Sequence, residues 1–568
     1  MSNAARFEEA PKDILFEQAS RSTLALNPLI GLRGKDLFDS ARILLKAMVN
    51  EPKVVTNQWL SFIGELGEIV SGKSERQPEA GDKRFVDPTW KSSALHSGLL
   101  KAYLALGNAL NEFVNQSSLS DVDKERANLI TTIWIDALSP TNNLLANPVA
   151  VRKLIDTGGK SLWRGFQHIL EDIGKNGGLP SQVDRSAFKV GESLASTPGS
   201  VVFRNELLEL IQYAPTTPNV WRRPLVITPP QINKYYAVDL APDKSMIRFL
   251  LDSGIQTFCI SWRNPTEEHR DWGLDTYVAA IDEAVDAVCD ITGCDDVSMM
   301  GSCSGGITSS AYFATLGTAN RAKIKNMILA VCILDCGTFG ESSFGSLITT
   351  ETMLAAKAAS RLQGVLDGQD LARLFAWMRP NDLIWNYWVN NYLLGNPPPA
   401  FDILFWNADT TRLPARLHSD YIDLYATNPF VNPGKLILNG RAIDMGKAKV
   451  DSYVIAGVTD HITPWKAVYE TARIMGDSTT FILANSGHLQ SLINPPTNRK
   501  ASYAIGPVNP GGPDAFLNSA EKRQGSWWLN WRDWLQERSD SQIEAPKSLG
   551  SKRHQVVGKA PGTYVFEQ

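Results

Sequence analysis

Cysteine and histidine are scarce in this chain. Its 568 residues include six cysteines and seven histidines. All six cysteines fall between Cys259 and Cys336 and none belongs to a CxxC pair, so neither a disulfide framework nor a zinc site is expected. We interpret every cysteine except Cys303 as a small buried hydrophobic side chain.

Long apolar runs and an excess of basic charge are also missing. No stretch reaches the ~20 apolar residues that a membrane-spanning helix needs, and the first residues lack the apolar core of a signal peptide. The formal net charge is −4, without a long basic run, so the charge pattern does not favour nucleic-acid binding. We therefore expect a cytoplasmic protein with no transmembrane segment and no nucleic-acid partner.

One stretch that the sequence does contain predicts a reactive side chain. The apolar run Val297–Met300 leads into the sequence GSCSG at 301–305, and a helix can begin near Ile307. This strand–turn–helix pattern is typical of a nucleophile elbow, with Cys303 where hydrolases usually carry serine. Glycine on both sides suits a strained turn, and the N-terminus of the helix would favour a thiolate. Because so short a pattern also arises by chance, the prediction depends on catalytic partners elsewhere.

Predicted strands and helices alternate from Val201 onward. The predicted strands are the apolar runs 225–228, 257–262, 297–300 and 327–334, and the predicted helix between the second and third is 277–288. Such alternation indicates a parallel sheet whose strands are buried on both faces. The order of strand, helix, strand, elbow, helix and strand is that of an α/β-hydrolase core.

Residues 1–195 are predicted to form a mainly helical N-terminal domain. Apolar residues recur at helical spacing from Leu37 to Met48. We favour a helix packed on its own domain, and a surface for a partner or a hydrophobic particle is the alternative. A cluster of helix-breaking residues at 196–199 marks the boundary, so 196–568 is the predicted catalytic domain.

Between about 336 and 445 the alternation stops. This segment is predicted to be helical and is rich in aromatic residues, as at 375–388 and 401–406. An insertion at this point of an α/β-hydrolase fold is predicted to form a cap whose aromatic side chains bury an apolar substrate and exclude water. A structural subdomain without a gating role is the alternative.

The last part of the chain carries two further predictions. Residues 526–534 predict an aromatic helix with Trp527, Trp531 and Trp534 on one side, packed against the sheet. The segment from Ile543 onward is rich in proline, glycine and lysine and is expected to be loosely held.

Two residues in the catalytic domain could serve Cys303 as base and acid. A cysteine nucleophile needs a base, and the base needs an orienting group. In α/β-hydrolases the order along the chain is nucleophile, acid, histidine, with both partners on loops after strands. Asp460 follows the predicted strand 453–456, and His488 follows the predicted strand 481–483. The predicted triad is therefore Cys303, Asp460 and His488, while His461 is a rival base that we interpret as a supporting residue.

Four other positions are weaker candidates for the site. The oxyanion hole would use the backbone N–H of Ser304 and a second N–H from the loop around Gln231 and Ile232. Cys332, on the strand after the elbow, and Gln490, two residues past His488, are candidates for the substrate pocket because their segments should approach the nucleophile. Either of the last two could equally be structural.

The choice of cysteine over serine indicates acyl transfer. A serine acyl-enzyme is an ester, so forming it from a thioester runs well downhill and leaves little driving force for onward transfer. A cysteine acyl-enzyme is itself a thioester and keeps the acyl group activated for an incoming hydroxyl. Under a cap that excludes water, the elbow therefore favours transfer from a thioester over hydrolysis.

Distinctive short motifs are spread over nearly the whole chain. They are PPQINKYY at 229–236, SWRNP at 261–265, GSCSGG at 301–306, RPNDLIWNYW at 379–388, TDHITPW at 459–465, SGH at 486–488 and NPP at 494–496. Together these motifs resemble those of polyhydroxyalkanoate synthases. The similarity is greatest to the class II enzymes of pseudomonads, which act on medium-chain monomers. The first twenty or so residues and scattered positions such as Ser302 match least.

The resemblance implies a function and a set of partners. It implies polymerisation of (R)-3-hydroxyacyl-CoA into polyester with release of coenzyme A. Cys303 would hold the growing chain, His488 would deprotonate Cys303, and Asp460 would either orient the histidine or activate the 3-hydroxyl of the monomer. It further implies a homodimer at the surface of cytoplasmic polymer granules, phasins as neighbours, and neither metal nor prosthetic group.

Two other functions fit the same motifs less well. A thioesterase or polyester depolymerase could use the same three residues, although cysteine at 303 weighs against hydrolysis. A granule-coating protein with a relict hydrolase fold is the non-enzymatic alternative, and an intact triad weighs against it.

Overall fold

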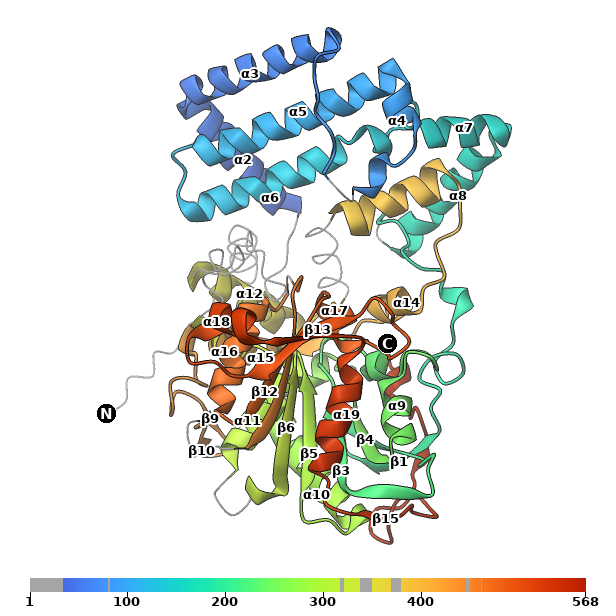
Figure 1. Ribbon diagram of the computed structural model, residues 1–568, viewed down its shortest axis with the longest axis vertical. Coiled ribbons are helices and arrows are strands. Elements are labelled where there is room, and N and C mark those ends of the chain that lie inside the picture. Colours follow the sequence, from blue (N-terminus) through green and yellow to red (C-terminus); the bar gives the residue numbers. More distant parts are fainter. Residues whose placement is uncertain are drawn as a thin grey trace. The chain divides into compact units, whose positions relative to one another are not determined.

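The structure, a computed structural model, describes residues 34–79, 82–176, 178–316, 321–337, 350–368, 380–445, 450–460 and 462–568. The chain forms two compact units (Figure 1). The first comprises Met1–Arg185, Ser343–Ala359 and Asp370–Leu404, and the second comprises Ser186–Ser342, Ser360–Gln369 and Phe405–Gln568. The stretch predicted to be a cap is thus divided between the two units.

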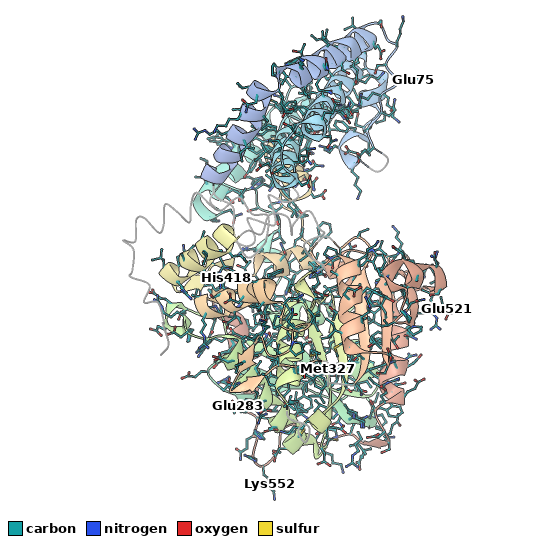
Figure 2. All side chains as sticks on the ribbon, turned by 90° about the vertical axis from the view of Figure 1, so that its left-hand side faces the viewer. Glu75, Glu283, Met327, His418, Glu521 and Lys552 are labelled. Carbon is teal, nitrogen blue, oxygen red and sulfur yellow. The ribbon has the colours of Figure 1, made fainter. Side chains whose placement is uncertain are left out.

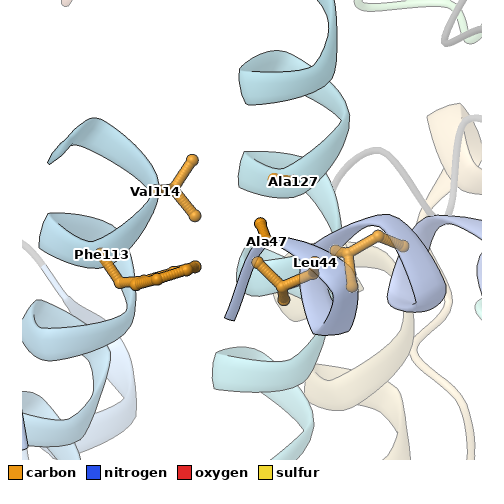
Figure 3. Close-up of a cluster of buried hydrophobic side chains, with 6 residues drawn as sticks. Leu44, Ala47, Phe113, Val114 and Ala127 are labelled. Carbon is orange, nitrogen blue, oxygen red and sulfur yellow. The ribbon is translucent and has the colours of Figure 1, made fainter. Parts of the chain in front are cut away.

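The first unit is helical, as the sequence predicted. Its helices are α2 (Gly34–Asn50), α3 (Pro52–Val70), α4 (Thr89–Ser92), α5 (Ala94–Gln116), α6 (Asp121–Ala137), α7 (Pro148–Asp156) and α8 (Lys160–Lys175). Leu44 and Ala47 of α2 pack with Phe113 and Val114 of α5 and with Ala127 of α6 (Figure 3). The prediction that the helix around Leu44 packs on its own domain is therefore confirmed.

Part of the aromatic segment predicted for the cap packs on α8 in this unit. It forms two π-helical turns, Asn381–Trp385 and Trp388–Leu393. A Cβ atom placed on Gly165 of α8 would lie 1.9 Å from the carbonyl oxygen of Tyr392, so only glycine permits this approach. The Tyr392 hydroxyl donates to Asp172 Oδ2 at 2.8 Å, which joins the turn to α8 by a buried polar contact.

The second unit is built on a 12-stranded sheet. The strands run in the order β14-β13-β12-β11-β6-β5-β3-β4-β2-β1-β16, with β15 paired to β3. The strands from β12 to β4 in this order are parallel to one another, and antiparallel strands flank them on both sides. Their bounds are β1 (Gly199–Arg204), β2 (Leu208–Tyr213), β3 (Asn219–Thr228), β4 (Ile255–Trp262), β5 (Val297–Ser302), β6 (Ile324–Ala330), β11 (Asp451–Gly457), β12 (Thr479–Ala484), β13 (Ser502–Pro507), β14 (Glu521–Gln524), β15 (Gln542–Glu544) and β16 (Gly558–Lys559).

Helices cover both faces of this sheet (Figure 1). They include α9 (Met246–Asp252), α10 (Leu274–Thr292), α11 (Ser304–Thr315), α15 (Ala415–Thr427), α16 (Trp465–Met475), α17 (His488–Leu492), α18 (Gly512–Ser519) and α19 (Trp527–Glu537). Every residue of β4 is buried, and Met327 of β6 lies in the packed interior (Figure 2). Double-sided burial explains the nearly continuous apolar runs of the sequence. The predicted α/β-hydrolase arrangement is confirmed.

The aromatic helix α19 packs against the sheet as predicted. The ring centroids of Trp527 and Trp534 lie 6.3 and 5.3 Å from that of Tyr453 on β11. The Tyr453 hydroxyl also donates to Asn530 Oδ1 of α19 at 2.8 Å. Large rings with a satisfied hydroxyl therefore join this helix to the central strands.

The expectation that the segment from Ile543 onward is loosely held is wrong. Strand β15 pairs with β3, and β16 pairs with β1 at the end of the sheet. Beyond β16, the backbone N–H groups of Thr563 and Tyr564 donate to Glu209 Oε2 at 2.8 and 3.0 Å. The Glu209 side chain is 0% exposed, and a buried carboxylate needs such donors. Composition alone missed these contacts because their partners lie on β1, β2 and β3, far away in the sequence.

Candidate active site

The predicted strand, turn and helix around Cys303 are all present. Strand β5 ends at Ser302 and α11 begins at Ser304, so Cys303 occupies the turn between them. Its φ of 50° and ψ of −124° are rare for a residue with a side chain. The strain holds the thiol at the N-terminus of α11, where free N–H groups favour negative charge.

Two glycines of this motif are required by close contacts. A Cβ atom on Gly305 would lie 2.3 Å from the carbonyl oxygen of Thr228, at the end of β3. A Cβ atom on Gly306 would lie 2.7 Å from Cys332 Sγ. The elbow therefore presses directly against the end of β3 and against the segment that follows β6.

Asp460 and His488 meet at the same edge of the sheet. Asp460 lies three residues after β11, and His488 begins α17 after β12. His488 Nδ1 donates to Asp460 Oδ2 at 2.7 Å. The sequence predicted this meeting because the carboxyl ends of neighbouring parallel strands share one edge.

The Asp460 carboxylate is held by residues of its own turn. The backbone N–H groups of Ile462 and Thr463 donate to Oδ1, both at 2.9 Å. The Thr463 hydroxyl donates to Oδ2 at 2.6 Å, beside the contact with His488. With its side chain 0% exposed, the carboxylate has acceptor bonds on both oxygens and is fixed in one orientation.

The electrostatics make His488 a strong base. Burial lowers the pKa of its imidazole. The charge and hydrogen bond of Asp460, together with the interaction with Cys303, raise the pKa by more than burial lowers it, so that it reaches about 10. Burial raises the pKa of Asp460, yet His488 and Thr463 together bring it below its ordinary value. Since Nδ1 is occupied by Asp460, Nε2 is the ring nitrogen available to the Cys303 thiol.

The weaker candidates from the sequence lie at several different places in the structure. Ser304 is the first residue of α11, and its Oγ accepts from the backbone N–H of Gln231 at 3.2 Å. Ile232 lies in the loop after β3, and its carbonyl accepts from the backbone N–H of Thr411 at 3.4 Å. Cys332 is buried against Gly306, and burial raises the pKa of its thiol well above the ordinary value. Gln490 is exposed on α17, and His461 lies outside the described residues.

Three residues of the site were missed from the sequence. Thr463 could have been found, since a threonine three residues after an aspartate often closes a turn onto it. Gln231 was named only as part of a loop, and Tyr421 carried no signal. The Tyr421 hydroxyl donates to Gln231 Oε1 at 2.9 Å across 190 residues of sequence, a contact that no local pattern predicts.

Neither a metal-binding cluster nor a membrane-spanning helix is found in the described part of the chain. Among these residues, no group of three or more histidine, cysteine, aspartate or glutamate side chains could hold a metal ion. No helix among them combines the length and the apolar character needed to cross a bilayer.

Comparison with known proteins first defines the class of fold. Residues 224–495 match the model of the alpha/beta hydrolase fold. Solved structures to which this chain is similar include a monoacylglycerol lipase of Paleococcus ferrophilus, which is 12% identical with a TM-score of 0.33 and covers 58% of this chain and 99% of its own. A monoglyceride lipase of Saccharomyces cerevisiae is 10% identical with a TM-score of 0.36, covering 62% of this chain and 99% of its own.

Full-length relatives then define the family. Residues 81–250 match the model of the poly-beta-hydroxybutyrate polymerase (PhaC) N-terminus. Poly(3-hydroxyalkanoate) polymerase 1 of Ectopseudomonas oleovorans is 47% identical over 98% of this chain and 99% of its own length. Polymerase 2 of that organism is 46% identical over 95% and 96%, and the polymerase subunit PhaC of Cupriavidus necator is 36% identical over 88% and 85%. The chain belongs to the poly(3-hydroxyalkanoate) polymerase family and is an acyltransferase, which confirms the predicted resemblance.

Proposed function

We propose that the chain polymerises (R)-3-hydroxyacyl-CoA into polyester, with release of coenzyme A, through a thioester on Cys303. The polymerase family supplies the reaction class. The observation that carries the mechanism is the His488 imidazole, which is hydrogen-bonded to Asp460 and whose pKa is raised by Asp460 and by Cys303. This is the nucleophile–base–orienting group arrangement of covalent acyl transfer.

Loading of the enzyme begins with the thiol. His488 Nε2 takes the proton of Cys303, and the thiolate attacks the thioester carbonyl of the monomer. The oxyanion forms near the N-terminus of α11, where the backbone N–H of Ser304 donates to it. When the intermediate collapses, the bond to the coenzyme A sulfur breaks, and the imidazolium returns its proton to that leaving group. One thioester is exchanged for another, so the acyl group stays activated.

Ester formation uses the same base. The imidazole removes the proton of an incoming 3-hydroxyl, and the resulting oxygen attacks the thioester carbonyl on Cys303. The bond between the acyl carbon and the Cys303 sulfur then breaks, and the imidazolium returns the proton to that sulfur. We assign Asp460 to orienting His488 and not to activating the hydroxyl directly. A carboxylate offers about four acceptor positions, and those of Asp460 meet two backbone N–H groups, the Thr463 hydroxyl and His488.

The decisive experiment incubates the purified chain with (R)-3-hydroxydecanoyl-CoA. Free thiol together with insoluble polyester supports the proposal, and free thiol with soluble acid would instead identify a thioesterase or depolymerase. Cys303→Ala is expected to abolish thiol release, because Cys303 occupies the nucleophile position of the elbow. His488→Gln should come close to doing so. Substantial polymerisation by either variant would contradict the mechanism.

The preferred monomer is proposed to be of medium chain length. The two Ectopseudomonas oleovorans polymerases are the relatives that support this choice. A substrate series from four to twelve carbons tests it, and a kcat/KM that is highest at four carbons would contradict it.

We also propose that the chain works in the cytoplasm as a homodimer at the surface of polyester granules, with phasins as neighbours. Helix α8 supports the granule contact, because Trp163, Phe166 and Ile173 are 63, 48 and 61% exposed. Exposed apolar side chains gathered on one helix mark an adsorption surface. Trp163→Glu combined with Phe166→Glu should lower the share of protein that sediments with granules, whereas Leu517→Glu, at an exposed position of α18, should not. Size-exclusion chromatography of the purified chain tests the dimer.

A further inference from the structure

The loop after β3 lies directly against the nucleophile elbow. Thr228, the last residue of β3, pairs with Gly301 of β5. The carbonyl oxygens of Thr228 and Pro229 lie so close to Gly305 that an added Cβ atom would come within 2.3 and 2.5 Å of them. The position of this loop relative to the elbow is therefore closely constrained.

Gln231 holds this loop in place through hydrogen bonds of its backbone N–H, its carbonyl oxygen and both polar atoms of its side-chain amide. Its backbone N–H donates to Ser304 Oγ at 3.2 Å, and its Nε2 donates to Thr308 Oγ1 at 3.0 Å. Its Oε1 accepts from the Tyr421 hydroxyl at 2.9 Å. Its carbonyl oxygen accepts from the Thr411 hydroxyl at 2.7 Å. The side chain is buried, with Gln231 only 3% exposed, so these bonds are shielded from water and costly to break.

The partners of Gln231 come from three separate parts of the second unit. Ser304 and Thr308 belong to the first turns of α11, directly behind the nucleophile, and the Thr308 hydroxyl donates back to the carbonyl of Ser304 at 3.0 Å. Tyr421 belongs to α15 and also lies 3.2 Å from Thr308 Oγ1. Burial raises the pKa of the Tyr421 hydroxyl, which keeps it protonated as a donor. The Thr308 and Tyr421 hydroxyls and the side-chain amide of Gln231 form one closed network.

This network determines the direction of one backbone N–H. The carbonyl of Gln231 and the N–H of Ile232 belong to the same planar peptide unit and point in opposite directions. When Thr411 and the side chain of Gln231 fix that peptide plane, the N–H of Ile232 is fixed with it. We propose that Gln231, held by Tyr421 and Thr308, is the positioning residue of the oxyanion site, setting where the Ile232 N–H meets the acyl oxygen. This inference rests on the proposed function, since it needs an acyl group on Cys303.

Two substitutions test the network, each with a matched control. Tyr421→Phe removes one hydroxyl, and Gln231→Met removes both side-chain hydrogen bonds at similar volume. Loss or misplacement of one oxyanion donor costs about 10²–10³ in kcat, so we expect kcat to fall at least about tenfold with KM close to that of the unchanged chain. Tyr312→Phe, which loses a hydroxyl bonded to Asp282, and Gln212→Met, which loses a buried bond to Gly550, are expected to leave kcat unchanged.

A second measurement separates positioning from a general structural role. The rate at which iodoacetamide alkylates Cys303, followed against pH, reports the thiol and His488 but not the oxyanion donors. The proposal requires an unchanged alkylation profile in Tyr421→Phe and Gln231→Met, and a double variant no slower than Gln231→Met alone. A lowered alkylation rate, or a kcat loss no larger than in the controls, would overturn it. Thiol release that persists in Cys303→Ala would instead refute the proposed function, whatever the Gln231 variants do.

Discussion

At the scale of single residues, charge and hydrogen bonds decide what the site can do. His488 lies between a carboxylate and a thiol, and Asp460 carries bonds on both oxygens. The sequence predicted the order and placement of Cys303, Asp460 and His488 because each follows a strand of recognisable pattern. It did not predict Tyr421, because that contact joins segments with no local relation to each other.

The raised pKa of His488 predicts how stability depends on pH. The imidazole binds its proton more tightly in the folded chain, with a pKa of about 10, than in the unfolded chain, where it returns to about 6.5. The resulting stabilisation is fully present below pH 6.5 and is lost as pH rises through 10. The difference in free energy of unfolding between the unchanged chain and His488→Gln should therefore shrink over that interval, as measured by urea denaturation. A difference that grows with pH would contradict the assignment.

At the scale of elements, the elbow is a junction between β5, α11 and the segment after β6. The apolar runs and glycines predicted this junction, since parallel strands buried on both faces leave a plain pattern. The close packing of Cys332 on Gly306 was not predictable, because a single sequence does not show which cysteine faces which glycine. The packing gives Cys332 a structural reason for its place, apart from any role in the pocket.

The contact between Gly306 and Cys332 predicts a packing defect. Gly306→Ala would bring a methyl group within 2.7 Å of Cys332 Sγ, and overpacking of this kind costs about 1–3 kcal/mol. We expect a lower melting temperature and a lower rate of thiol release through Cys303. Both should recover in part when Cys332→Gly is added. Gly174→Ala, on α8 with open space around it, is the matched helix control and should be neutral or stabilising. Equal effects of the two alanine substitutions would refute the contact.

At the scale of the whole molecule, the sequence predicts the character of each unit better than the long-range contacts of the C-terminal segment. The helical character of the first and the layered sheet of the second follow from apolar periodicity. The attachment of residues 558–568 to β1 and β2 does not, because the pairing of β16 and the burial of Glu209 depend on contacts between residues about 350 positions apart in the sequence. The proline and glycine residues of this segment belong to backbone that is bonded to β1 and β2 and not to a loosely held tail.

Removal of residues 558–568 should destabilise the second unit. Glu209 would lose the Thr563 and Tyr564 donors and would retain Arg204 as partner. A buried acceptor left unsatisfied costs about 1–3 kcal/mol, and more when it is charged. We expect a lower melting temperature, and Glu209→Gln in the shortened chain should recover part of it because the uncompensated charge is gone. Identical melting of the full and shortened chains would contradict this role.

The fully bonded carboxylate of Asp460 has a consequence for the order of steps in chain growth. With the acceptor positions of Asp460 occupied, the His488 imidazole must pass its proton to the departing coenzyme before it can accept one from the next alcohol. Under the proposed mechanism, loading and coupling therefore alternate and never overlap. Each monomer added to the polyester then corresponds to two proton transfers through the same ring nitrogen, the first from Cys303 to coenzyme A and the second from the alcohol to Cys303.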